Sequence, residues 1–422
     1  MNNAFLKSFE CLRSVYVDRA FSSIELNKKL TFAKSSDKAL ITKLVYGVLD
    51  RDIELEYIIK QFVRKAKPDV MIFLKIGVYC LKYLSIPVYA VVNDVCELSK
   101  LTGDRHVVGF VNATLKNVHD ALENGGVALP EDKWERMSVE NSYPLWALLK
   151  LVKDYGEETA KNIVSFKLPT STTVRVNTTK ISVGKFERIL KESFSDYSPT
   201  ILPDAFAVNG RISVDPSLFT MQSLSSMLVA RATECQGCDV LDSCAAPGGK
   251  SVYMKTLGAE SVTACDVYEH RVALIENYSS RLDVKVDAVC ADSTVFRPEW
   301  EGKFDVVLCD APCSGFGVLD SRPDIKLFRE NKDISELMKT QAAILDNCSR
   351  YVKKGGSLVY STCTVFKNEN SQIVDRFLAS HDEFERGVLH LPMTNADGKS
   401  AYQFLPHQDG VQGFFCAKLK RI

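Results

Sequence analysis

The sequence predicts an α/β fold in which a doubly wound, largely parallel sheet follows an all-α domain and a small α+β segment. From about residue 220 onward, short runs of strand-forming residues alternate with helical stretches, which is typical of such sheets. Between residues 5 and 118, apolar residues recur at helical spacing and β-strand alternation is scarce. With 422 residues, the chain is long enough for two or three domains, each with its own core.

The charge balance argues against a histone-like or polybasic protein, because 53 Lys and Arg residues face 53 Asp and Glu residues. The positive excess is local: residues 1–116 hold 18 Lys and Arg against 12 Asp and Glu, a net charge of +6 that hints at a polyanion partner. The sequence has no secretion signal and no apolar run of membrane-spanning length, and 13 cysteines fit a reducing compartment. We therefore expect a cytoplasmic protein, monomeric and without a membrane partner.

The first predicted domain, residues 1–130, is all-α. Its helices are marked by two apolar stripes at helical spacing and are broken by Pro68 and Pro87. The stripes consist of Ile41, Leu44, Val45, Val48 and Leu49, and of Ile72, Leu74, Val78, Leu81 and Leu84. Taken alone, they predict only an ordinary helical core.

A connecting α+β segment is predicted over residues 131–219. The alternating residues 172–177 and the short run 206–208 are typical of strands, and residues 183–193 between them are typical of a helix. From these residues alone, the segment has no assigned function.

The third domain, residues 220–422, carries the parallel sheet. Its strands are predicted at residues 240–242, 261–266, 286–290, 304–309, 357–361 and 414–419. In such sheets, ligands bind in the crevice beyond the carboxyl ends of the strands, so side chains that follow these strands are the first candidates for function.

A glycine-containing turn after the first of these strands predicts a small-molecule site. It consists of Cys244, Ala245, Ala246, Pro247, Gly248, Gly249 and Lys250 and leads into a helix. Adjacent glycines let the backbone approach a ligand, and the start of a helix offers free amide donors. The turn matches neither the Gly-x-Gly-x-x-Gly pattern of dinucleotide sites nor a phosphate-binding loop.

Three aspartates at strand ends favour a cationic ligand that carries a ribose. Asp266 ends the second strand, where a carboxylate can accept both ribose hydroxyls, and Asp292 and Asp310 follow the third and fourth. S-adenosylmethionine, with its sulfonium charge and no phosphate, fits this arrangement. The alternative, in which the aspartates only cap helices, is common for any single one. Cys235 and Cys238 lack a second pair of ligands, so no metal is expected.

Two cysteines lie just beyond strand ends and are candidates for covalent chemistry. Cys313 stands in Asp310-Ala311-Pro312-Cys313-Ser314-Gly315, and Cys363 in Tyr360-Ser361-Thr362-Cys363-Thr364. The alternative is that they are small buried hydrophobic residues. We interpret in that way the cysteines within or beside the predicted elements, namely Cys265, Cys290, Cys309 and Cys348.

The two cysteine frames resemble motifs IV and VI of the RNA cytosine-C5 methyltransferases. The first domain is similar to the RNA-binding NusB family in phrases such as Leu44-Val-Tyr-Gly-Val-Leu49 and Gly109-Phe-Val-Asn-Ala-Thr-Leu115. Arg175 and Asn177 match a phrase that precedes the catalytic domain, and the resemblance implies that the α+β segment 131–219 helps to hold RNA. The resemblance spans nearly the whole chain. It is to the bacterial branch that joins a NusB-like domain to the catalytic domain and acts on small-subunit (16S) ribosomal RNA.

The resemblance implies a Rossmann-like, S-adenosylmethionine-dependent methyltransferase domain and assigns the site. Cys363 attacks the base, Cys313 assists product release, and Asp310 and Lys250 support the reacting ring. Residues 244–250 with Asp266, Arg271, Asp292 and Asp310 hold the cofactor. Two basic residues of the loop after Cys313, Arg322 and Lys326, are candidates for touching phosphate.

The sequence alone leaves two rival functions to consider. A DNA cytosine-C5 methyltransferase attacks with its Pro-Cys cysteine, usually followed by Gln, and needs no second Thr-Cys; Ser314 and Cys363 argue against it. An RNA-binding assembly factor that keeps the fold without turnover is disfavoured by the retention of both thiols.

Overall fold

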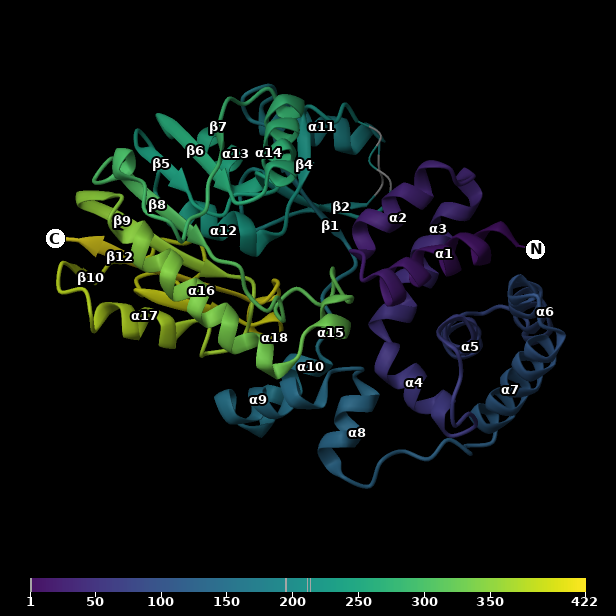
Figure 1. Cartoon of the computed structure of the whole chain (residues 1–422). Coiled ribbons are helices and arrows are strands. Elements are labelled where there is room, and N and C mark those ends of the chain that lie inside the picture. The colour runs from purple at the N-terminus through teal and green to yellow at the C-terminus, as the bar shows by residue number, and fades with distance from the viewer. Residues whose placement is uncertain (1, 194–195, 211, 213) are drawn as a thin grey trace. The chain divides into compact units, whose positions relative to one another are not determined.

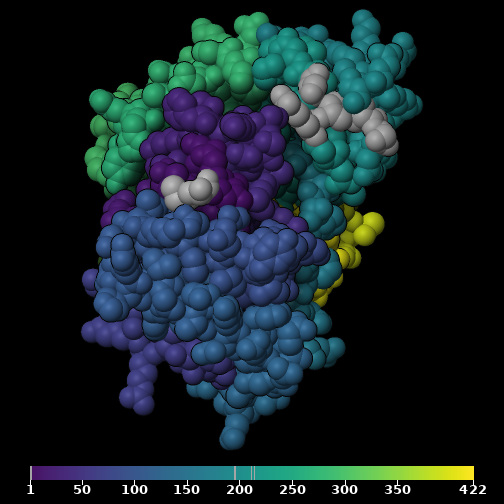
Figure 2. Space-filling model, turned by 90° about the vertical axis from the view of Figure 1, so that its right-hand side faces the viewer, coloured from purple at the N-terminus to yellow at the C-terminus, as the bar shows by residue number. Residues whose placement is uncertain are grey.

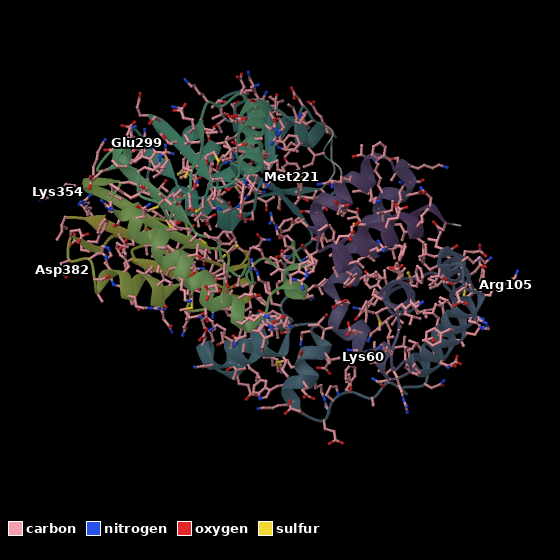
Figure 3. All side chains as sticks on the ribbon, in the orientation of Figure 1. Lys60, Arg105, Met221, Glu299, Lys354 and Asp382 are labelled. Carbon is pink, nitrogen blue, oxygen red and sulfur yellow. The ribbon has the colours of Figure 1, made fainter. Side chains whose placement is uncertain are left out.

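The computed structural model describes residues 2–193, 196–210, 212 and 214–422, and the chain divides into two compact units (Figure 1). The first unit comprises Met1–Ser165 together with Leu319–Glu330, and the second comprises Phe166–Val318 and Asn331–Ile422. Charged side chains such as Lys60 and Arg105 in the first unit and Glu299 and Lys354 in the second extend into solvent (Figure 3). No helix in the described part of the chain is long and apolar enough to cross a membrane.

The first unit is helical throughout and forms the purple-to-blue surface in Figure 2. Both predicted stripes lie in its core, where the first is fully buried, and proline opens α5 and precedes α6, as predicted. The helices are α1 (Asn3–Asp18), α2 (Ser22–Thr31), α3 (Ser35–Asp50), α4 (Asp52–Lys60), α5 (Pro68–Tyr83), α6 (Val88–Ser99), α7 (Arg105–Glu123), α8 (Lys133–Glu140), α9 (Leu145–Tyr155) and α10 (Glu157–Ser165), with a 3-10 turn at Lys100–Thr102.

Helices α8–α10 cluster with the first unit, whereas the sequence places residues 131–165 in the connecting segment. Their apolar faces are buried, for example at Leu148, Leu151 and Ile163. The three-part division of the chain at residues 130 and 219 stays a prediction.

A short excursion of the chain, Leu319–Glu330, also packs within the first unit and contains α15 (Ile325–Phe328). Ser22 donates to Asp324 from its hydroxyl at 2.6 Å and from its amide at 3.4 Å. The Lys326 ammonium donates to the carbonyl of Ser142 at 2.9 Å and to that of Asp50. The expectation that Lys326 touches phosphate is therefore wrong, because this side chain is buried on backbone carbonyls; Arg322 remains exposed.

The second unit contains two sheets. The smaller has the strand order β2-β3-β1-β4, is antiparallel, and packs α11 (Val183–Ser193) through Phe186 and Leu190. Its strands are β1 (Thr172–Val176), β2 (Tyr197–Pro199), β3 (Ala205–Val208) and β4 (Phe219–Met221).

The larger sheet has the order β10-β12-β9-β8-β5-β6-β7, with β11 paired to β12. β9, β8, β5, β6 and β7 are parallel, and β10, β11 and β12 add antiparallel pairings. The strands are β5 (Asp239–Asp242), β6 (Ser261–Asp266), β7 (Asp287–Cys290), β8 (Phe304–Asp310), β9 (Val352–Thr362), β10 (Phe384–Arg386), β11 (Ala401–Phe404) and β12 (Phe414–Arg421). The predicted α/β class is confirmed.

Helices cover both faces of this sheet. α12 (Leu224–Ala232), α13 (Gly249–Thr256) and α14 (Glu269–Leu282) pack on one another, and α16 (Asn331–Ser349) packs with α17 (Ser371–Leu378). The core on the α16 side includes Cys265, Val307 and Leu345, whereas Ala264 packs with Ile275 of α14. The chain runs from β5 outward to β7 and then returns to β8 on the other side of β5, so the strand order reverses beside β5. Ligand sites of open α/β sheets lie at such a reversal.

We predict that Asp324→Ala lowers the stability of the first unit by about 1–3 kcal/mol, because it leaves the buried Ser22 hydroxyl without its acceptor. Urea unfolding of the Trp300→Phe background, followed by tryptophan fluorescence, reports on this unit, which holds Trp134 and Trp146, whereas Trp300 lies in the second unit. Arg322→Ala, an exposed position two residues away, is the control and should be nearly neutral. Equal midpoints for the two variants would contradict this account.

Candidate active site

The two candidate thiols lie together beyond the ends of neighbouring parallel strands. Asp310 at the end of β8 pairs in register with Ser361 of β9, and Cys313 and Cys363 follow a few residues later. Their Sγ atoms are 3.2 Å apart, and the Cys363 amide donates to the Cys313 sulfur at 3.2 Å. Both thiols are partly buried. The structure therefore joins two sequence positions 50 residues apart in one pair.

The Cys313 thiol is the member of this pair that retains its proton. Its hydrogen bond with Cys363 is the largest cause that raises its pKa well above the ordinary value, followed by burial and by the negative charges of Cys363, Glu369 and Asp310. Two neighbouring thiols also do not readily ionise together.

Lys250 and Asp310 form an ion pair beside the thiols. Nζ of Lys250 lies 2.6 Å from Oδ2 of Asp310, and the Ser361 hydroxyl donates to Oδ1 of the same carboxylate at 2.6 Å. Burial is the largest single influence and opposes the positive charge of Lys250, but the attraction and hydrogen bond of Asp310, with the charges of Asp242 and Cys363, together raise the lysine pKa. A charged ammonium near Cys363 therefore favours its thiolate.

The turn after β5 brings backbone close to the crevice. Gly248 has φ of +105°, and a Cβ at this position would lie 3.2 Å from the Cα of Ile275, so a side chain here would be strained. Gly249 begins α13, and its carbonyl accepts from Arg175 at 3.1 Å. Arg175, which sequence analysis noted only for its resemblance, is thus a buried support of this turn.

Asp266 presents an unused acceptor at the end of β6. It is 3% exposed, Oδ2 accepts from the Ala246 amide at 3.3 Å, and Oδ1 has no hydrogen bond. The Arg271 guanidinium lies 3.3 Å from Oδ1 in an ion pair and donates to the Ala246 carbonyl at 3.4 Å. A buried carboxylate oxygen without a hydrogen bond fits a ligand that donates hydroxyls.

Asp292 is less closely associated with the crevice. Its side chain is exposed, and Oδ1 accepts from the amide of Thr294 at 2.8 Å and from its hydroxyl at 2.7 Å. These bonds form a local turn of the kind expected from a capping aspartate. Its predicted contact with the cofactor stays a prediction.

Sequence analysis missed two buried carboxylates. Asp242 at the end of β5 is 1% exposed; it accepts from the Ser251 hydroxyl at 2.6 Å, while Oδ1 has no hydrogen bond. Burial raises its pKa to about 7. Glu369 is fully buried between the two cysteine loops. Asp242 could have been predicted as a site residue because it ends the strand directly before the glycine turn. Nothing in the sequence spacing identified Glu369.

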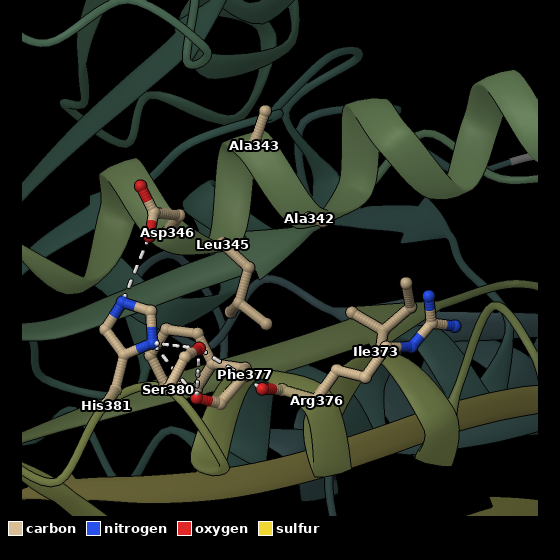
Figure 4. Close-up of a pocket in the computed structure, with 9 residues that line it drawn as sticks. All are labelled: Ala342, Ala343, Leu345, Asp346, Ile373, Arg376, Phe377, Ser380 and His381. Carbon is tan, nitrogen blue, oxygen red and sulfur yellow. Dashed lines mark hydrogen bonds and ion pairs between the residues drawn. The ribbon is translucent and has the colours of Figure 1, made fainter.

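A separate hollow of about 340 Å³ lies between α16 and α17 (Figure 4). His381 stacks on Phe377 with 4.0 Å between ring centroids and pairs with Asp346 at 3.0 Å. The lining contains no thiol and none of the residues predicted for the site, so we do not assign the reaction to it. Its residues are Ala342, Ala343, Leu345, Asp346, Ile373, Arg376, Phe377, Ser380 and His381.

Comparison with known proteins agrees with both parts of the chain. Residues 229–420 match the family model described as 16S rRNA methyltransferase RsmB/F, and residues 6–120 match the NusB family. A Bacillus subtilis protein named "Probable ribosomal RNA small subunit methyltransferase B" is 34% identical, over 98% of each chain. The chain belongs to the ribosomal RNA small subunit methyltransferase B family. The resemblance inferred from its motifs is therefore confirmed.

A further relative of this family member and one solved structure extend the comparison. The Photorhabdus laumondii ribosomal RNA small subunit methyltransferase B is 30% identical over 91% of each chain. The crystal structure of PH0851 superposes with a TM-score of 0.86 over the whole chain and 99% of that structure, at 21% identity, and so supports the fold.

We predict that Asp242→Asn removes a pH-dependent penalty on stability. Because the carboxyl pKa rises from 3.8 to about 7 on folding, stability that is present below pH 4 is lost as the pH rises toward and beyond 7. The variant should therefore be more stable than the wild type at pH 8 and should differ least at low pH. Parallel urea midpoints of the two proteins from pH 4 to 8 would contradict the prediction.

Proposed function

We propose that this protein transfers a methyl group from S-adenosylmethionine to carbon 5 of a cytosine in small-subunit ribosomal RNA, with Cys363 as nucleophile and Cys313 assisting release. The observation that carries the proposal is the 3.2 Å contact of two thiols beside the Lys250–Asp310 ion pair. The relatives named above, which are ribosomal RNA small subunit methyltransferases, support the class of substrate.

The reaction at carbon 5 explains why a thiolate is needed. This carbon of a cytosine is a weak nucleophile, and addition of a thiolate at carbon 6 turns carbons 4 to 6 into an enamine that is reactive at carbon 5. The Cys363 sulfur forms the new bond to carbon 6, while Asp310 hydrogen-bonds the ring and Lys250 offsets the negative charge that develops. Asp310 ends β8 next to the strand that leads to the thiol, and Lys250 of α13 pairs with Asp310.

The second thiol is suited to the release step. After Cys363 has bonded to carbon 6, it is no longer a thiolate hydrogen-bonded to Cys313, and the largest cause of the raised Cys313 pKa is gone. Cys313 can then lose its proton to solvent, and the resulting thiolate accepts the proton from carbon 5. As that proton leaves, its bonding electrons form the carbon 5–carbon 6 double bond, and the carbon–sulfur bond to Cys363 breaks.

The residues around the glycine turn fit S-adenosylmethionine. Oδ1 of Asp266, which has no hydrogen bond, is an acceptor for ribose hydroxyls, and residues 244–250 offer backbone at the start of α13. Arg271 of α14, Asp292 after β7 and Asp310 at the end of β8 are the other proposed cofactor residues. When bound, this cofactor supplies an electrophilic methyl group and a sulfonium charge that carboxylates favour. The residues of the site would hold the cofactor and exclude water from it.

The helical unit is proposed to supply RNA affinity. The net charge of +6 over residues 1–116 favours a polyanion in a salt-dependent manner. A cytosine stacked in a duplex cannot present carbon 6 to a thiol, so the target base lies in a loop or is flipped out. Recognition of the surrounding RNA shape then falls largely to surfaces outside the crevice.

We predict that Cys363→Ala abolishes methyl transfer and leaves S-adenosylmethionine affinity nearly unchanged, because the lost thiol contacts the base. Methyl transfer is measured with labelled S-adenosylmethionine and unmodified ribosomal RNA fragments. The affinity for S-adenosylmethionine is measured by calorimetric titration. Cys238→Ala, at a half-exposed thiol outside the site, is the control. Substantial turnover by Cys363→Ala would remove it as the nucleophile, and the absence of turnover in the wild type would sink the proposed function.

We predict that Cys313→Ala attacks and methylates the base but releases it slowly. The consequence is a protein–RNA adduct that survives denaturing electrophoresis. The double variant Cys313→Ala/Cys363→Ala should form none. Normal turnover of Cys313→Ala without an adduct would reduce Cys313 to a structural role.

Asp266→Ala should weaken S-adenosylmethionine binding by about 1.5–3 kcal/mol, the scale for loss of charge-assisted hydrogen bonds to buried hydroxyls. Calorimetry measures the change, with Asp283→Ala, an exposed residue in the loop after α14, as the control. An unchanged affinity would place the ribose elsewhere.

A further inference from the structure

A buried glutamate outside the predicted site links the two cysteine loops. Glu369 lies in the loop between β9 and α17 and has no exposed surface. Its Oε1 accepts from the Ser314 amide at 2.9 Å, and its Oε2 accepts from the Ser314 hydroxyl at 2.6 Å. Gln341 of α16 donates to the same Oε1 at 2.9 Å and to the Pro312 carbonyl at 3.0 Å. The residues on both sides of Cys313 are thus held by one network.

The same loop also holds the residues on both sides of Cys363. The Thr362 hydroxyl donates to Oδ1 of Asn370 at 2.5 Å, and Nδ2 of the same side chain donates to the Thr364 carbonyl at 3.0 Å. The Tyr360 hydroxyl donates to the Glu369 carbonyl at 2.7 Å. The hydroxyls of Ser314 and Thr364 are 2.8 Å apart and close the network between the two loops.

From this geometry we infer that Glu369 is a positioning residue, which fixes the Cys313 loop against Cys363 and thereby sets the rate of product release. The inference rests on the proposed function of the two thiols. A carboxylate is suited to this place because it accepts from a backbone amide, a hydroxyl and an amide side chain at once. Bonds between a charged acceptor and neutral donors are also stronger than neutral ones.

The negative charge of Glu369 affects the pH dependence of product release. Among the residues that the structure describes, three negatively ionisable groups face Cys313, namely Cys363, Asp310 and Glu369. The cation beside them is Lys250 of α13, which pairs with Asp310. The negative charge of Glu369 is one cause of the raised Cys313 pKa, after the hydrogen bond to Cys363, burial and the charge of Cys363. Removal of that charge lowers the Cys313 pKa, so release steps that require its thiolate move to lower pH.

The test compares Glu369→Gln with Asp346→Asn. The glutamine keeps the shape of Glu369, but its amide nitrogen cannot accept from Ser314. Asp346 is an exposed carboxylate on α16 that pairs with His381, and it serves as the matched control for the loss of a charge. Both proteins are assayed at full length, under reducing conditions, with unmodified small-subunit ribosomal RNA fragments.

We expect Glu369→Gln to lower kcat about 10- to 100-fold, the scale for misplacing a reacting group by a fraction of an ångström to an ångström. KM for RNA and the affinity for S-adenosylmethionine should stay within about twofold. A protein–RNA adduct should accumulate, and the pH midpoint of its release should shift downward. Asp346→Asn should match the wild type.

Wild-type kcat and pH profile in a folded Glu369→Gln would overturn the inference. A parallel loss of kcat and of cofactor affinity would also overturn it, because that pattern indicates a general structural role. If Glu369→Gln does not fold, Ser314→Ala removes one donor to Glu369 and should show the same accumulation of adduct at smaller amplitude; its absence would again overturn the inference. A wild-type protein that transfers no methyl group to the RNA would sink the proposed function instead.

Discussion

The parallel register between β8 and β9 is the constraint on which the site depends. Hydrogen-bonded pairing sets Asp310 opposite Ser361, so the loops that carry Cys313 and Cys363 leave the sheet at the same level. Because side chains alternate between the two faces of a strand, a shift of one residue would direct Ser361 away from Asp310 and separate the two thiols. Their 3.2 Å contact and the Ser361–Asp310 hydrogen bond both follow from this register.

Two glycines in β9 make this register possible. Phe304 pairs with Val352, but Val306 already pairs with Ser357, so β9 contains extra residues opposite Asp305. Gly355 takes φ of +79°, and a Cβ on Gly356 would lie 2.7 Å from the Asp305 carbonyl. The chain therefore absorbs the irregularity before Ser357, and the five pairs that follow run without interruption to Asp310.

The parts of the site that follow from local patterns were predictable from the sequence. Strand-forming runs, the turn at residues 244–250 and the two cysteine frames each lie within a few residues, and parallel topology implies that their ends share one edge. The rest depends on distant packing. Glu369 contacts Ser314 across 55 positions, Lys326 bonds carbonyls 184 and 276 positions away, and the pKa of Asp242 is set by burial. The short strands β2, β4, β10 and β11 escaped prediction because three or four residues carry little periodicity.

The central claim, that Cys363 rather than Cys313 bonds to carbon 6, is tested most directly by trapping the adduct. RNA in which the cytosines are replaced by 5-fluorocytosine carries a fluorine at carbon 5, which a base cannot remove as a proton, so a methylated adduct cannot be released. After incubation with S-adenosylmethionine and digestion, mass spectrometry identifies the modified peptide. The account predicts the nucleotide on the peptide that contains Cys363. A nucleotide on the Cys313 peptide of the wild-type protein would contradict it.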